Sequence, residues 1–379
     1  MAQTVSSTHA YYSIISIAAA ASIILFPFIG LRHKPRYPNR KKLPSSLESW
    51  RKLHDVPYNV VWDELRYFLE SHGFQLWRRG FGAQKWDGDF PQCDNFMFLT
   101  SHKPRNMSLV NWKSFATTEV GLRHAARMNG VRDVVLRVIV NLGEGHAHLN
   151  LLKRLARPPD SLLSSNHILP ILYEVVFEDI IILAVPKLIF DLDDACRPGK
   201  FSNSIEDVLY MIVQALEGVS YLHQNLIAHQ DLFLNNFMVE WVPESLAERT
   251  SVTRPRVYII DLETAVEFPE HSKVSERLCS KFHRSLDDYG RYVAPELKTL
   301  QPYCPFRLDM WQLGMNLNMA VETDLKEIDE IWLGLCAHAP EERLTADEAL
   351  KALDEYLRRT PSTALHRKLL TPKDKNLVF

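Results

Sequence analysis

The sequence predicts an α+β fold in which a small β-rich lobe precedes a larger helical lobe, with one transmembrane helix before both. Residues 131–140 and 179–188 have the dense β-branched and apolar residues of buried strands. From Asp207 onward, apolar residues recur at three- and four-residue spacing, which indicates helices. Because the strands come first and the longest helical pattern comes later, we expect two lobes that meet at about residues 188 and 189.

The composition is that of a folded protein with no affinity for nucleic acid. Hydrophobic residues make up 46% and charged residues 24% of the 379 residues, close to ordinary globular usage. A net charge of −2 provides no basic field that would attract nucleic acid. The five cysteines form no CxxC pair and leave one unpaired in any full set of disulfides, so we expect reduced thiols in a cytosolic domain.

Residues 11–31 predict a membrane anchor after a short flank at residues 1–10. The run of 21 residues carries no formal charge, and as a helix it is roughly 31 Å long, which matches a bilayer core of about 30 Å. A cleaved signal peptide is the main alternative, but the flank lacks the expected Lys or Arg. Basic residues follow the run and none precedes it, so the positive-inside rule predicts a single-pass protein whose large domain faces the cytosol. The same basic residues would contact anionic membrane lipid.

The rest of the chain divides into a linker, a large domain and a tail. Residues 32–55 combine prolines with basic and polar residues, which predicts a linker. The large domain is expected at residues 56–359, beginning with a helix at residues 57–72. A loop-rich insert follows at about residues 73–119. Residues 360–379 are expected to form a flexible tail.

One motif in the helical half carries recognisable chemistry. His229, Asp231 and Asn236 have the spacing H-x-D-x-x-x-x-N, which resembles the catalytic loop of protein kinases. Phosphoryl transfer needs a carboxylate to orient the attacking hydroxyl and oxygen ligands to hold magnesium. The resemblance implies that Asp231, His229 and Asn236 are catalytic residues, with Asp231 as the carboxylate that orients the hydroxyl, and that Asn236 also binds metal. Asp261 ends an apolar strand 25 residues after Asn236 and resembles the magnesium-binding Asp of the D-F-G motif.

Three further matches extend the resemblance to protein kinases. Ala294-Pro295-Glu296 is similar to the A-P-E motif, Asp309 to the helix Asp that receives backbone N–H groups of the catalytic loop, and Arg343 to the Arg that pairs with the A-P-E Glu. The resemblance covers roughly residues 115–359. It implies a protein-kinase-like fold, ATP and Mg²⁺ as cofactors, and a protein substrate or binding partner. The organisation also resembles divergent kinase-like families of filamentous and mushroom-forming fungi.

The residues that would clamp the nucleotide phosphates depart from the family pattern. The strand Lys is replaced by Arg137, a planar fork in place of a compact ammonium. The helix Glu that would pair with it aligns with His148, and Glu144 lies one turn earlier. No G-x-G-x-x-G precedes Arg137 at the usual distance, since Gly80 and Gly82 lie far upstream. The resemblance therefore assigns ATP binding to Arg137 within an altered clamp.

The catalytic loop and the D-F-G position also differ from the family. Gln230 replaces the Arg that reads a phosphorylated activation loop in many kinases, so that mode of switching is expected to be absent. Phe233 replaces the loop Lys that would neutralise the transferred phosphate. Glu263 replaces the Gly of D-F-G.

These features leave three functions open. The first is an attenuated, membrane-anchored Ser/Thr protein kinase that uses ATP and Mg²⁺. The second is a pseudokinase that binds partners or nucleotide without turnover. The third is a small-molecule phosphotransferase similar to choline and aminoglycoside kinases, against which the A-P-E motif and Arg343 argue.

Overall fold

The structure, a computed structural model, describes nearly all of the chain after its N-terminal segment. The described residues are 37–80, 83–86, 114–116, 121–188, 190–197, 203–240, 254–299 and 301–370. The anchor expected at residues 11–31 lies outside them and stays a prediction. Among the helices that the structure describes, none is both long and apolar enough to cross a membrane.

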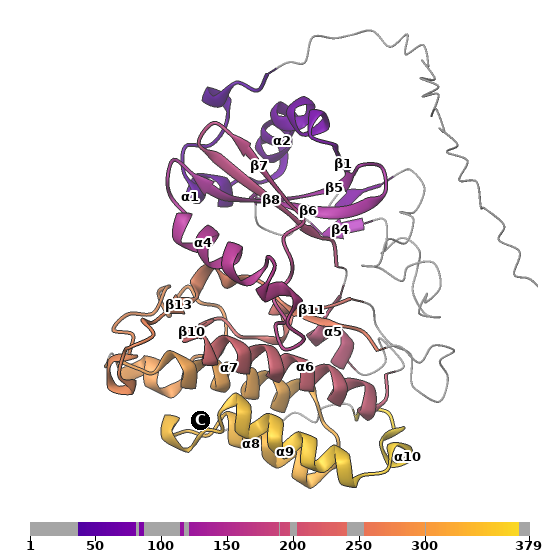
Figure 1. Cartoon of the computed structure of the whole chain (residues 1–379), viewed down its shortest axis with the longest axis vertical. Coiled ribbons are helices and arrows are strands. Elements are labelled where there is room, and N and C mark those ends of the chain that lie inside the picture. Colours follow the sequence, from indigo (N-terminus) through magenta and orange to yellow (C-terminus); the bar gives the residue numbers. More distant parts are fainter. Residues whose placement is uncertain are drawn as a thin grey trace, which may run out of the picture. The chain divides into compact units, whose positions relative to one another are not determined.

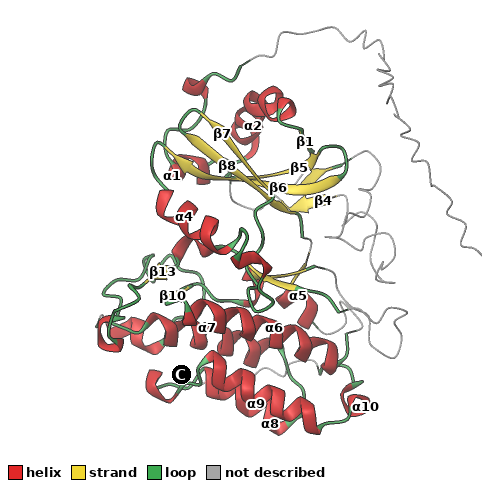
Figure 2. Cartoon of the chain, viewed as in Figure 1, coloured by secondary structure: helices red, strands yellow, loops and turns green. Residues whose placement is uncertain are grey.

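A five-stranded antiparallel sheet forms the first lobe (Figures 1 and 2). Its strands in spatial order are β1 (Phe74–Leu76), β5 (Arg123–Met128), β6 (Arg132–Asn141), β8 (Ile180–Pro186) and β7 (Tyr173–Phe177). The strands expected at residues 131–140 and 179–188 are β6 and β8. Successive residues of a strand point to opposite faces. The even positions of β6 at Val134, Leu136 and Val138 are accordingly buried in a cluster with helix α2.

Two helices cover one face of this sheet. They are α1 (Leu47–Arg51) and α2 (Asp55–Ser71), the second close to the helix expected at residues 57–72. Trp50, Trp62 and Leu65 are fully or almost fully buried against the sheet. On the other face, α4 (His146–Leu155) places Leu149 against Leu183. The sheet is thus enclosed between α1 and α2 on one side and α4 on the other (Figure 1).

The residues expected to be a linker are packed on the domain from Tyr37 onward. A 3₁₀ turn at Arg40–Lys42 precedes α1, and Leu43 and Leu47 are buried. Arg40 forms a two-pronged ion pair with Asp179, with nitrogen to oxygen distances of 2.6 and 2.7 Å. The linker prediction gave weight to the prolines and basic residues and overlooked the apolar side chains between them, whose burial fixes this segment.

The second lobe is helical around a central helix. α6 begins at Ile205 because Ser204 and Asp207 form a reciprocal capping box. The helices of this lobe are α5 (Leu192–Cys196), α6 (Ile205–Gln224), α7 (Pro305–Ala320), α8 (Lys326–Leu335), α9 (Ala346–Arg359) and α10 (Ser362–Leu365). Buried apolar residues of α5, α7, α8 and α9 pack with those of α6 in one hydrophobic core.

The segment expected to be a loose tail is also packed, as far as it is described. Leu365 and Leu369 are buried in the helical core. Arg367 accepts a hydrogen bond at its carbonyl from the N–H of Ile205, 2.7 Å away. The polar composition of residues 360–379 concealed these two apolar anchors, so the prediction is wrong for residues up to Leu370.

Short strands flank the loops that contain Asp231 and Asp261. They pair as β10 (Ile227–Ala228) with β13 (Val266–Glu267), and as β12 (Val257–Ile259) with β11 (Phe237–Val239), which also pairs with β9 (Phe190–Asp191). The described residues between β1 and β5 include a separate small sheet in the order β2 (Arg78–Gly80), β3 (Ala83–Lys85), β4 (Ser114–Ala116).

Candidate active site

Strand pairing brings the two expected metal ligands to the same end of a β-ribbon. Phe237 of β11 lies opposite Ile259 of β12. Asn236 directly precedes β11 and Asp261 follows β12, so antiparallel pairing places both at one edge. The N–H of Ile260 donates to the carbonyl of Asn236 at 2.9 Å and extends the pairing up to the site.

A row of polar side chains on the buried helix α7 forms hydrogen bonds with the backbone of the catalytic loop. Asp309, Gln312 and Asn316 recur at three- and four-residue spacing and therefore share one helix face. Each accepts backbone N–H groups of the loop: Asp309 from His229 and Gln230, Gln312 from Leu232, and Asn316 from Leu234, at 2.7 to 3.2 Å. The role expected of Asp309 is confirmed. Gln312 and Asn316 were missed, although their spacing within an apolar helix was a usable signal.

Three side chains orient the carboxylate of Asp231. The side-chain amide of Asn236 donates to Asp231 Oδ2 at 3.1 Å, and the hydroxyl of Tyr289 donates to Oδ1 at 3.1 Å. Arg291 Nε lies 3.5 Å from the same Oδ1. Burial and the negative charge of Asp231 raise the pKa of Tyr289 above its usual value, so the phenol stays protonated and donates. These contacts hold the carboxylate of Asp231 in one orientation.

Arg291 also places a positive charge where the family's loop Lys is missing. Its guanidinium carbon lies 4.4 Å from the ring centre of Phe233, the residue that replaces that Lys. The same guanidinium donates to Asn235 Oδ1 at 2.8 Å. A cation over an aromatic face is electrostatically favourable. No sequence pattern predicts this arrangement, because Arg291 belongs to a different segment from the catalytic loop.

Arg137 lies beside Asp261, as its assignment to the phosphate clamp requires. Arg137 Nη2 is 2.7 Å from Asp261 Oδ1. Burial raises the pKa of Asp261, but the charge and hydrogen bond of Arg137, with smaller effects of Arg123 and His229, outweigh this and hold the pKa below its usual value. Asp261 is therefore ionised, in a left-handed backbone conformation with φ of 66°. A non-glycine residue in this conformation is typical of a constrained functional site.

Glu263 is a second carboxylate that pairs with Arg137, beside Asp261, whereas the sequence had pointed to His148 or Glu144. Glu263 Oε2 lies 2.7 Å from Arg137 Nη2. Glu144 instead accepts a hydrogen bond from the backbone N–H of Leu47, at 2.9 Å. Glu263 is also paired with Arg51 of α1. An ionic chain therefore runs from the segment expected to be a linker, through Glu263 and Arg137, to Asp261.

His148 occupies the helix position of the missing Glu and is kept neutral. Burial, followed by the positive charge of Arg137, lowers the pKa of His148 to about 3, against an opposing effect of Asp261 and a further lowering by Arg51. Its Nε2 is buried and has no hydrogen-bond partner among the described residues. A protonated imidazole would be repelled by Arg137, so the ring stays neutral. A neutral imidazole carries no negative charge, so His148 cannot replace the missing Glu as the ion-pair partner of Arg137.

This neutral histidine predicts a pH-dependent loss of stability. Below pH 6.5 the unfolded chain protonates His148 whereas the folded chain does not, so its contribution to stability falls as the pH falls. Between pH 7 and pH 5 the loss is up to about 2 kcal/mol in the free energy of unfolding. We expect His148→Gln to flatten the pH dependence measured by urea unfolding, and the exposed control His146→Gln to leave it unchanged. Equal slopes for wild type and His148→Gln would contradict this.

His229 and Gln230 are structural parts of the loop. His229 is fully buried, and its ring nitrogens lie 2.9 Å from the carbonyl of Ile260 and 3.2 Å from the N–H of Asp231. Gln230, with φ of 65°, donates to the carbonyl of Thr264 and accepts from the hydroxyl of Tyr303. The side chain of Gln230 thus forms hydrogen bonds with uncharged groups of the fold.

The two expected metal ligands offer donors that suit Mg²⁺. Asn236 uses its side-chain N–H groups on the carbonyl and carboxylate of Asp231, which leaves Oδ1 without a donor among the described residues. Asp261 is ionised, and Arg137 contacts its Oδ1. Mg²⁺ prefers carboxylate and amide oxygens. The donor set therefore fits a divalent ion held together with substrate phosphates.

A largely apolar cavity adjoins these residues between the two lobes. Arg123, Arg137, His148 and Asp261 form its polar part. Apolar side chains from both lobes line the remainder, among them Val135, Leu183, Leu188, Met238 and Ile259. Such a cavity, which combines a charged group with a largely apolar lining, suits a ligand with a planar base and an anionic tail.

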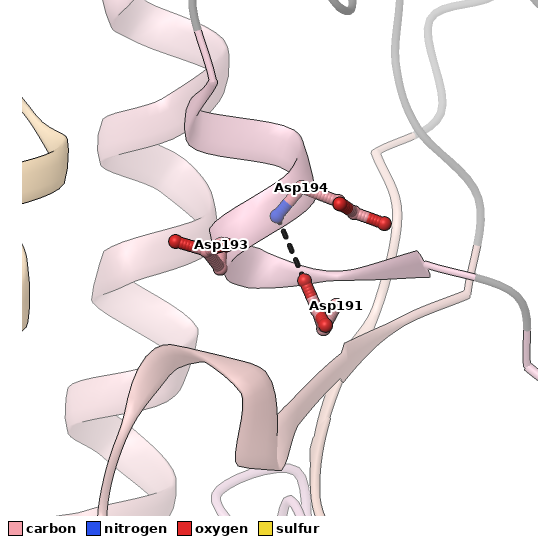
Figure 3. A group of neighbouring side chains, drawn as sticks. All are labelled: Asp191, Asp193 and Asp194. Atoms are coloured by element: carbon pink, nitrogen blue, oxygen red, sulfur yellow. Dashed lines mark hydrogen bonds between the residues drawn. The ribbon is translucent and has the colours of Figure 1, made fainter. Parts of the chain in front are cut away.

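Three neighbouring carboxylates, Asp191, Asp193 and Asp194, form the acidic group in Figure 3. Asp191 is the N-cap of α5 and accepts from the N–H of Asp194 at 2.7 Å. Asp193 is paired with Arg197. Acidic residues at a helix N-terminus are favoured by capping and by the helix dipole. The local structure thus accounts for this group without a metal.

The expected pair of Glu296 and Arg343 is confirmed. Two parallel contacts join the guanidinium to the carboxylate, at 2.6 and 2.7 Å. The side chain of Arg343 is fully buried and that of Glu296 is 11% exposed. This pair fixes the end of the segment that runs from Asp261 over the site.

Comparison with known proteins finds similarity to protein kinases in the part of the chain from residue 179 to residue 325. Residues 179–325 match the protein kinase domain family. The chain is 29% identical over 125 residues to the serine/threonine-protein kinase SAPK3 of rice (Oryza sativa subsp. indica), a match that covers 33% of this chain and 31% of that protein. It is 35% identical over 105 residues to the serine/threonine-protein kinase ppk8 of Schizosaccharomyces pombe, covering 28% and 17% respectively.

A third relative, the serine/threonine-protein kinase SRK2I of Arabidopsis thaliana, is 29% identical over 122 residues, which cover 32% of this chain and 28% of that protein. The matched stretches thus span less than a third of these relatives' length. The family match begins at Asp179, after the strand that carries Arg137. The matched residues, within a two-lobed fold, are thus similar to part of a protein kinase domain.

Proposed function

We propose that this chain is an attenuated Ser/Thr protein kinase that uses ATP and Mg²⁺. The observation that carries the proposal is the joint placement of Asp231, Asn236 and Asp261. Their carboxylate and amide groups are oriented by contacts that do not depend on a ligand. Preorganised charge and positioning supply nearly all of the catalysis of phosphoryl transfer.

In this mechanism Asp231 accepts the proton of the attacking hydroxyl. Tyr289 and Asn236 fix its two oxygens, so the remaining lone pairs face the substrate. Arg291, 3.5 Å from Asp231, supplies positive charge near the transferred group in place of the family's loop Lys. Asn236 and Asp261 would hold Mg²⁺, which supplies neutralisation of the phosphate charge when bound.

The attenuation follows from the ionic chain around Arg137. Arg137 contacts both Asp261 and Glu263 at 2.7 Å, so the phosphates and the metal must compete with existing ion pairs. The same observation favours the second candidate, a pseudokinase in which these pairs are never exchanged for a nucleotide. The bidentate pair of Glu296 and Arg343 continues to argue against a small-molecule phosphotransferase.

A titration of the purified chain with ATP, with and without Mg²⁺, tests the proposal. We expect weak binding that requires Mg²⁺ and that Asp261→Asn abolishes, because Asp261 is the ionised oxygen ligand at the site. Asp193→Asn, which alters a carboxylate outside the cavity, is the matched control and should bind as the wild type does. Absence of nucleotide binding at millimolar ATP with Mg²⁺ would reject the kinase and leave the pseudokinase.

The membrane-anchored part of the proposal rests on the sequence of residues 11–31 alone. Residues 37–55 are packed onto the sheet and reach the active site through Arg51. An anchor before residue 37 would therefore be followed closely by the folded domain.

A further inference from the structure

The strand that enters the cavity beside Arg137 carries a second arginine that the kinase resemblance does not account for. Arg123 of β5 lies directly opposite Arg137 of β6 in the antiparallel register. Directly opposed residues share a face of the sheet and lie close together. Both arginines line the cavity that also contains Asp261.

The two arginines differ in their partners. Arg137 contacts two carboxylates, Asp261 and Glu263. Within the described part of the chain, the guanidinium of Arg123 makes no ion pair and no side-chain hydrogen bond. Burial and the positive charge of Arg137 lower the pKa of Arg123, which reflects the cost of holding a second cation there. An anion bound in the cavity would offset that cost.

The sum of the charges around Arg123 also favours a bound anion. Arg51 and Arg137 are matched by Glu263 and Asp261, so the ionic chain by itself is neutral. Arg123 adds one positive charge to this neutral group, on the cavity side. A guanidinium presents a planar fork that matches phosphate oxygens. The group thus has an excess charge and a geometry suited to phosphate.

Of the two described residues directly before β5, residues 121 and 122, the glycine packs against a helix. Gly121, two residues before Arg123, faces α1: a Cβ there would lie 2.2 Å from the carbonyl oxygen of Trp50 and 2.5 Å from Cβ of Leu53. Its own carbonyl accepts from the indole N–H of Trp62 at 2.9 Å. This glycine serves helix packing and does not face the cavity.

We propose that Arg123 is a second phosphate-binding cation, so that Arg123 and Arg137 together hold the phosphate chain of a nucleoside di- or triphosphate in place of a glycine-rich loop. The proposal rests on the proposed function, because it names residues of the same nucleotide site. It assigns the base to the apolar lining of the cavity and the phosphates to its charged group. Arg123 should therefore discriminate nucleotides from nucleosides.

The test compares the affinities of ATP, ADP and adenosine for the full chain in the presence of Mg²⁺. Arg123→Gln should weaken ATP and ADP binding about tenfold or more, since a charge-assisted fork is lost, and change adenosine binding less than twofold. Arg123→Lys should weaken ATP binding by an intermediate factor, because the charge remains without the fork. Arg157→Gln, an arginine of the same lobe that pairs with Glu174 outside the cavity, should leave all three affinities unchanged.

A stability measurement separates binding from a structural role. Without nucleotide, Arg123→Gln should melt at the wild-type temperature or above it, because an unpaired cation opposite Arg137 is removed. A lower melting temperature with equal losses for ATP and adenosine would overturn the proposal, as would an unchanged ATP affinity. Wild-type chain that binds ATP through Arg123 but transfers no phosphate would reject the proposed kinase activity and retain this site. No nucleotide binding by the wild type would reject both.

Discussion

The Arg343→Ala variant is expected to lose about 3–5 kcal/mol in the free energy of unfolding, because one charge of a buried pair is left without its partner. The side chain of Arg343 is fully buried, and it donates to Glu296 at both nitrogens. Its guanidinium also donates to the carbonyls of Ala337, Arg307 and His338. The substitution therefore leaves a carboxylate and several backbone acceptors unsatisfied at once. Urea unfolding measures the change.

The control for this variant is Arg358→Ala on the exposed face of α9. Arg358 pairs with Asp354 one turn away, and both side chains are mostly or half exposed. Such exposed pairs contribute little to stability, so this variant should unfold at nearly the same urea concentration as the wild type. A loss below about 1 kcal/mol for Arg343→Ala would show that the pair with Glu296 does not hold the segment over the site.

The Asp231→Asn variant is expected to lower the rate of phosphoryl transfer about 10²- to 10⁴-fold, the usual contribution of a positioned general base. Asparagine keeps the size of the side chain and the contact with Asn236 but removes the charge that accepts the proton. The affinity for ATP with Mg²⁺ should stay within about twofold, because the expected metal ligands are Asn236 and Asp261. Single-turnover transfer to a generic protein substrate and equilibrium ATP binding give the two readouts.

Asp288→Asn provides the matched control, since Asp288 is an exposed residue directly before Tyr289. It should change neither the transfer rate nor the affinity. If Asp231→Asn transfers phosphate as fast as the wild type, the carboxylate is not the base. If it loses ATP binding together with transfer, the loop has been disturbed, and Asp231 then positions the metal ligand Asn236.

Local chemistry made much of the second lobe predictable from the sequence. His229, Asp231 and Asn236 lie within eight residues, and the backbone between them has few arrangements that suit a catalytic loop. Asp309 was also predicted, because its helix resembles the protein-kinase helix whose Asp receives backbone N–H groups of the catalytic loop, and the N–H groups of His229 and Gln230 do donate to it. The strands β6 and β8 and the helix α6 were likewise predictable, since the spacing of apolar residues along the sequence indicates the type of element.

The nucleotide end of the site was decided by tertiary structure. Glu263 pairs with Arg137 across 126 residues of sequence and with Arg51 across 212. No local pattern marks either contact, and the family pattern pointed to His148 and Glu144 instead. The pairing depends on α1 and the sheet lying together, which follows from the burial of Trp50 and Leu47 in a segment whose composition indicates a linker.

The sequence by itself determined the catalytic loop, Asp261 and the pair of Glu296 and Arg343, because each is a short motif whose chemistry restricts the residues that can serve. Only the tertiary structure decided which further cations lie at the site: Arg123 opposite Arg137 on the adjacent strand, and Arg291 over Phe233. Side chains far apart in sequence converge there through sheet register and helix packing. An ion pair requires only that opposite charges meet in space, so the order of residues along the chain leaves the choice of partner open.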